Sequence, residues 1–199
     1  MIEIDPKPLN GKRAKGFALD VHTIQSKLTG ADEFGHLMFD SERSPMGEAL
    51  YYLKYRFDKN KAVDIAETVS DFIKNAWPDL DSIDYIVPVP PSNLSRPFQP
   101  VQEVARIVSD TLGIHLSVGD LVKKAQTPQL KDLHDEDERL SILSDAFEIK
   151  SRNLEDKHIL LFDDLLGSGA TLRTIIDVLY DKAGVRLVSV LVLTRKRKR

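Results

Sequence analysis

The chain of 199 residues contains no cysteine. This absence excludes disulfide bonds and thiolate zinc sites, so any metal must be held by oxygen or imidazole ligands. No stretch approaches the roughly 18 continuous apolar residues that a membrane span needs, and the segment MIEIDPKPLNGKRAKG lacks the apolar centre of a signal peptide. These absences predict a cytoplasmic protein, and 42% hydrophobic residues suit one main domain.

Several functional motifs are also missing. Neither GxxxxGK[ST] nor GxGxxG occurs, which argues against nucleoside triphosphate hydrolysis and dinucleotide binding. HExxH is absent as well, and the histidines are scattered singly. Most of them are therefore expected to be structural.

Charge is distributed unevenly along the chain. The sequence has 28 Lys and Arg against 31 Asp and Glu, a net charge of −3. Its last five residues, Arg195 to Arg199, are all basic, which leaves −8 for residues 1–194. Such a run is typical of a solvated tail; a phosphate-binding arm for nucleic acid is the second possibility.

A small β element is expected ahead of the main fold. Residues 15–24 alternate as a half-buried strand does, and residues 36–39 are expected to return as its hairpin partner. The sequence therefore predicts a β-rich hood over residues 1–43, a main domain over residues 44–194 and a basic tail over residues 195–199.

The main domain alternates between helical and strand patterns. Ser44 and Pro45 are typical of an N-cap and a first helical residue, which predicts a helix to about residue 55. Further helices are expected near 59–77, 100–112 and 171–182, the last two closed by Gly113 and Gly184. Strands are expected near 82–90, 121, 146–149, 159–162 and 186–193. This order predicts an α/β fold with an open, mainly parallel sheet flanked by helices. Residues 126–139 are polar and aperiodic, as in a long loop that covers a site.

The segment HILLFDDLLGSGATLRTIIDVL, residues 158–179, combines features that suit a ligand site. Ligands of parallel sheets bind beyond the carboxyl ends of the strands, where Asp163 and Asp164 suit sugar hydroxyls or Mg²⁺. The backbone N–H groups of residues 167–171, with the hydroxyls of Ser168 and Thr171, suit a phosphate. Each feature alone also fits a plain strand end and turn. Their conjunction favours a sugar phosphate.

The run ILLFDDLLGSGAT resembles the phosphoribosyl diphosphate (PRPP) motif of type I phosphoribosyltransferases. The resemblance implies that family's fold, with ribose hydroxyls and Mg²⁺ bound by Asp163 and Asp164. It also implies a 5′-phosphate loop formed by Leu166, Gly167, Ser168, Gly169, Ala170 and Thr171. Gly167 stands where 6-oxopurine transferases carry an acidic residue, so hypoxanthine or guanine is not the expected acceptor.

The segments IVPVPPSNLSRPFQPVQEVA, TPQL and ERLSILSDAF precede this motif. Their order is similar to that of ComF-like, competence-associated phosphoribosyltransferase-like proteins over about residues 50–194. The similarity implies a pyrophosphate loop formed by Pro90, Pro91, Ser92 and Arg96. The chain departs from the pattern in RPFQP and at Ile142, where an asparagine is usual, and it lacks the N-terminal cysteine cluster of many such proteins.

Together these features predict a Mg²⁺-dependent phosphoribosyltransferase that transfers phosphoribose from PRPP to an unidentified acceptor and releases diphosphate. Cations that bracket the expected loop suit a closed diphosphate site: Lys123, Lys124, Lys131 and Arg139. Two alternatives stay open: a regulator that senses PRPP or a nucleotide without turnover, and a competence-related adaptor that binds nucleic acid through Arg195 to Arg199. The family resemblance also implies a homo-oligomer.

Overall fold

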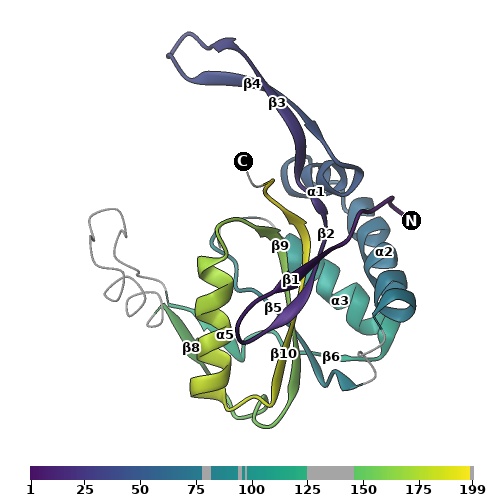
Figure 1. Cartoon of the computed structure of the whole chain (residues 1–199), viewed down its shortest axis with the longest axis vertical. Coiled ribbons are helices and arrows are strands. Elements are labelled where there is room, and N and C mark those ends of the chain that lie inside the picture. Colours follow the sequence, from purple (N-terminus) through teal and green to yellow (C-terminus); the bar gives the residue numbers. More distant parts are fainter. Residues whose placement is uncertain (78–81, 94–95, 97, 125–145, 198–199) are drawn as a thin grey trace.

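A computed structural model describes residues 1–77, 82–93, 96, 98–124 and 146–197. Its centre is a six-stranded sheet in the order β1-β2-β10-β9-β5-β6 (Figure 1). Among the described strands of this sheet, β1 runs antiparallel to β2 and the other neighbouring pairs are parallel. The strands are β1 (Lys7–Asn10), β2 (Lys15–Val21), β5 (Tyr85–Pro88), β6 (His115–Leu116), β9 (His158–Leu166) and β10 (Leu187–Arg195).

Helices cover both faces of this sheet, which confirms the predicted α/β fold with a mainly parallel sheet (Figure 1). Leu160 and Phe162 of β9 join the core under α1, α2 and α3, whereas Ile159 and Leu161 join the core under α5. Because both faces of β9 are buried, its sequence is a continuous apolar run rather than an alternating one. The helices are α1 (Pro45–Tyr55), α2 (Asn60–Ala76), α3 (Pro100–Leu112) and α5 (Ala170–Ala183).

Local signals set the helix ends where the sequence predicts them. The Ser44 hydroxyl accepts a hydrogen bond from the Gly47 N–H at 3.0 Å and caps α1. Gly113 and Gly184, with φ of 69° and 64°, end α3 and α5 in the left-handed conformation that glycine adopts without strain. In the described part of the chain, no helix is long and apolar enough to span a membrane.

The predicted pairing of residues 15–24 with residues 36–39 is wrong. The first segment is β2, which lies in the main sheet, parallel to β10. A Cβ on Gly16 would lie 1.8 Å from the Val190 carbonyl oxygen, so only glycine permits this close approach. The hairpin instead consists of β3 (Thr23–Ala31) and β4 (Leu37–Arg43), which project away from the sheet (Figure 1).

The strands expected near residues 121 and 146–149 are present but do not belong to the main sheet. They form a separate antiparallel ribbon, β7 (Leu121–Lys123) with β8 (Phe147–Ile149). Leu121 and Phe147 are buried in the same apolar cluster as α5, which holds this ribbon on the α5 side of the sheet. The loop expected over residues 126–139, with Lys131 and Arg139, lies outside the described residues.

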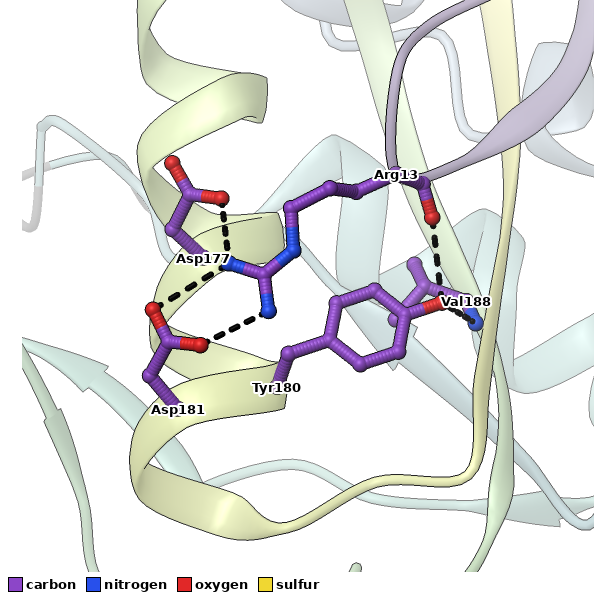
Figure 2. Close-up of polar contacts among 5 residues, drawn as sticks. All are labelled: Arg13, Asp177, Tyr180, Asp181 and Val188. Atoms are coloured by element: carbon purple, nitrogen blue, oxygen red, sulfur yellow. Dashed lines mark hydrogen bonds and ion pairs between the residues drawn. The ribbon is translucent and has the colours of Figure 1, made fainter.

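A polar clamp joins the turn between β1 and β2 to α5 (Figure 2). Arg13 forms ion pairs with Asp177 at 2.8 Å and with Asp181 at 2.7 Å, and its guanidinium lies 4.7 Å from the centre of the Tyr180 ring. The Tyr180 hydroxyl donates to the Arg13 carbonyl and accepts from the Val188 N–H, both at 3.0 Å. The clamp fixes the edge of the sheet against the helix that carries the predicted phosphate loop.

Candidate functional site

A cavity of about 590 Å³ lies at the carboxyl ends of β5 and β9. Its wall contains all the residues that the sequence predicts for the carboxylate pair, the phosphate loop and the pyrophosphate loop. The segment after β5 contributes Pro90, Pro91, Ser92 and Arg96. The end of β9 and the start of α5 contribute Asp163, Asp164, Leu166, Gly167, Ser168, Gly169, Ala170 and Thr171. Segments more than 60 residues apart in the sequence therefore meet around one space, and the roles assigned to them stay predictions.

Asp163 and Asp164 lie within β9 rather than after it. The strand continues to Leu166, and its pairing with β10 extends through both acidic residues. Asp163 Oδ1 accepts the backbone N–H of Asp164 at 2.8 Å. Burial, together with the neighbouring Asp164 carboxylate, raises the pKa of Asp163 to about 7. The two adjacent acids therefore have different electrostatic environments.

A lysine that the sequence analysis missed contacts this pair. Lys54 Nζ lies 2.6 Å from Asp164 Oδ2, and the two side chains are only 13% and 17% exposed. Lys54 belongs to α1, more than a hundred residues before Asp164. No local pattern distinguishes it from the other charged residues of that helix, since only the packing of α1 directs it into the cavity.

The residues after Thr194 also contribute to the site. The Lys196 N–H donates to the Leu166 carbonyl at 2.9 Å, and Lys196 lines the cavity. Arg197 Nη1 donates to the Ile24 carbonyl at 2.8 Å. Arg195 ends β10, so the first three residues of the predicted basic tail are anchored to the fold; residues 198–199 lie outside the described part of the chain.

The turn between β9 and α5 supplies a helix N-terminus to the cavity. Gly169 has a φ of 81° and precedes the first residue of α5, and the Ser168 hydroxyl accepts the Ala170 N–H at 3.4 Å. The first N–H groups of a helix have no partner within it and attract anions. Gly167 does not have a left-handed φ, and a Cβ there would meet nothing within 4 Å. Of the two glycines, only Gly169 is required by the backbone.

The charge of the cavity suits an anionic ligand. The described residues that line it include four cations, Lys54, Arg96, Lys123 and Lys196, but only two carboxylates, those of Asp163 and Asp164. This excess is opposite in sign to the net charge of −3 of the whole chain. Lys124, the neighbour of Lys123, is not among the lining residues. Clustered cations raise the local concentration of phosphorylated ligands.

A resident divalent metal fits this arrangement poorly. Mg²⁺ prefers near-octahedral oxygen coordination, and within the described part of the chain no group of three or more His, Asp or Glu side chains could hold a metal ion. Of the two cavity carboxylates, Asp164 already pairs with the Lys54 ammonium. Asp163 and Asp164 therefore do not form a complete metal site by themselves.

Comparisons with known proteins give limited similarity. Neither a scan against protein-family models nor a search of curated proteins finds a match. Among solved structures, adenine phosphoribosyltransferase from Thermoanaerobacter pseudethanolicus is 16% identical over 87% of this chain and 84% of that chain, with a TM-score of 0.48. The Saccharomyces cerevisiae enzyme of the same name was solved in complex with an imino-altritol bisphosphate and adenine. It is 12% identical over 85% of this chain and 84% of that chain, with a TM-score of 0.49.

A hypoxanthine phosphoribosyltransferase from Staphylococcus aureus is 14% identical over 68% of this chain and 63% of that chain, with a TM-score of 0.43. These similarities are too low to define an activity. The function proposed below therefore depends on the cavity and its residues.

Proposed function

We propose that the cavity binds PRPP and that the protein is a phosphoribosyltransferase. The observation that carries this proposal is the convergence of three groups on one cavity with excess positive charge: a carboxylate pair, a helix N-terminus and a proline-rich loop with Arg96. The ribose hydroxyls of PRPP suit Asp163 and Asp164, and its 5′-phosphate suits the turn at Gly169.

The proposed reaction replaces one bond at the ribose C1 carbon. The bond from C1 to the diphosphate oxygen breaks, diphosphate leaves with the electron pair, and the acceptor nucleophile bonds to C1 and loses a proton. Positive charge develops on the sugar while negative charge develops on the diphosphate, so the cavity acts mainly by positioning and charge stabilisation. Mg²⁺ enters in this scheme with the diphosphate, as part of the substrate.

Binding and turnover are tested separately. Titration calorimetry with PRPP and Mg²⁺ should show binding that Asp163→Asn with Asp164→Asn weakens at least about tenfold, since two hydrogen-bond acceptors lose their charge. Asp71→Asn, at an exposed position of α2, is the matched control and should bind as the wild type does. Binding that survives the double substitution would reject the site assignment.

Diphosphate release across a panel of nucleophilic bases then separates the enzyme from a regulator. Release that depends on one acceptor supports transfer, whereas tight binding without release supports PRPP sensing. For the competence-related adaptor, replacing the five basic residues 195–199 by glutamine, which keeps the backbone bonds of β10 and Lys196, should abolish a salt-sensitive shift of DNA mobility. The ComF-like assignment and the cytoplasmic location belong to the same proposal.

Self-association is proposed through the hairpin of β3 and β4. Leu28 and Phe39 face each other across the ribbon and are 53% and 55% exposed, and Leu37, on the same face as Phe39, is 62% exposed. A two-stranded ribbon is marginally stable without a cover for its apolar face. A second copy supplies an identical face with the same three apolar side chains. Sedimentation analysis should show an oligomer that Phe39→Ser shifts towards monomer, and a monomeric wild type would reject this assignment.

A further inference from the structure

The contact between Lys54 and Asp164 places a cation inside the proposed ligand site. Lys54 Nζ lies 2.6 Å from Asp164 Oδ2 in a largely buried pair, and both residues line the cavity. Among the described residues, no hydrogen bond reaches Asp164 Oδ1 or Asp163 Oδ2. The ammonium therefore compensates charge on one side of the acid pair and leaves oxygens available on the other.

A divalent cation on this acid pair would compete with the lysine. Mg²⁺ and Mn²⁺ bind carboxylate oxygens, and the oxygen that Lys54 contacts already has a positive partner. To bind both carboxylates, the metal would have to displace the ammonium or lie close to it against charge repulsion. Lys196 adds a second positive charge to the same cavity wall.

Lys54 also reduces the repulsion between the acid pair and a phosphorylated ligand. Without it, two adjacent carboxylates would face a sugar that carries a phosphate dianion. A buried charge that loses its partner is strongly unfavourable. The lysine thus provides within the protein the charge compensation that a bound metal would provide.

We propose that Lys54 is the resident cation of this cavity and that the ribose 5-phosphate part of the ligand binds there without a divalent metal. This inference rests on the proposed function for the identity of the sugar. Lys54 is a ligand-binding and positioning residue in this scheme. Metal is then needed only for the diphosphate part of PRPP.

The first experiment measures metal binding to the protein without sugar. Mn²⁺ titrated into the wild type and followed by electron paramagnetic resonance should find no site in this cavity. Lys54→Met keeps the apolar stem but removes the charge, and it should bind one Mn²⁺ at least about tenfold more tightly. Lys54→Met with Asp164→Asn should lose that site again. Equal Mn²⁺ binding by the wild type and Lys54→Met would overturn the role of Lys54.

The second experiment measures ribose 5-phosphate binding by calorimetry in EDTA and in Mg²⁺. The wild-type dissociation constant should change by less than about threefold between the two solutions. Lys54→Met should bind at least about tenfold more weakly in EDTA and recover part of the loss in Mg²⁺. A wild type that loses tenfold or more in EDTA would overturn the proposal.

Two further variants separate the charge of Lys54 from its effect on folding. Lys54→Arg keeps the cation and should retain metal-independent binding. Lys61→Met removes the same charge from an exposed pair with Asp64, at 2.8 Å on α2, and should behave as the wild type does. If ribose 5-phosphate binds in neither solution, the ligand assignment and the proposed function fail together. Mn²⁺ binding to the wild type instead rejects the role of Lys54 alone.

Discussion

Replacing Asp163 by asparagine should make the protein more stable near neutral pH. In the folded protein, burial and the Asp164 carboxylate raise the pKa of Asp163 to about 7, from an ordinary value of 3.8. An acid whose pKa is higher in the folded state binds its proton more tightly there than in the unfolded chain. Its contribution to stability therefore falls as pH rises from the ordinary pKa to the folded one and then levels off.

The size of this effect follows from the two pKa values. Each unit of difference corresponds to about 1.4 kcal/mol. The difference in bound protons between the folded and unfolded states is integrated from about pH 5.5 to about pH 8. Over this range the unfolding free energy of the wild type should fall by about 2 kcal/mol relative to that of Asp163→Asn.

Urea unfolding at several pH values, followed through Trp77 fluorescence, measures the effect. The difference in unfolding free energy between Asp163→Asn and the wild type should widen as pH rises across this window. Asp71→Asn, at an exposed site on α2, controls for the loss of a carboxylate and should follow the wild-type profile. Parallel profiles for the wild type and Asp163→Asn would refute the assignment of a raised pKa to Asp163.

The remaining predictions concern the turn at α5 and the polar clamp. Gly167→Ala should change the unfolding free energy by less than about 0.5 kcal/mol, because the added methyl group enters open space. Gly169→Ala should cost about 1–2 kcal/mol because of its φ of 81°; equal losses for the two would contradict the backbone assignment. Tyr180→Phe should cost about 1–2 kcal/mol, because the Val188 N–H loses its acceptor. PRPP affinity should be unchanged in Tyr180→Phe, since Tyr180 does not line the cavity; weaker binding there would contradict a purely structural clamp.

The sequence predicted features that depend on neighbouring residues. Ser44 with Pro45 specifies the start of α1 through one side-chain hydrogen bond, and Gly113 and Gly184 specify helix ends through one backbone conformation. The site residues near Asp163 follow the same logic, because strand, turn and helix N-terminus are consecutive in the chain. Parallel strand order then brings the loop after β5 to the same end of the sheet.

Features that depend on distant contacts were missed. The alternation of apolar and polar residues over residues 15–24 fits a hairpin strand and a strand near the edge of the main sheet equally well. The contact that decides between the two, the close approach of Gly16 to Val190, is visible only in the folded structure. Lys54 and Lys196 are ordinary charged residues in the sequence. They become part of the site because α1 and the segment after β10 both pack against the end of β9.

The hairpin of β3 and β4 enters and leaves the fold at almost the same point. The Ser44 hydroxyl donates to the Val21 carbonyl, and Gly47 packs against the His22 backbone, so the two ends of the hairpin segment adjoin each other. A short connection between His22 and Ser44 could therefore replace the whole ribbon without changing the sheet or the cavity. The ribbon is thus a modular part of the fold: among the described strands, β3 and β4 pair only with each other, so their sequence is not constrained by the register of the main sheet.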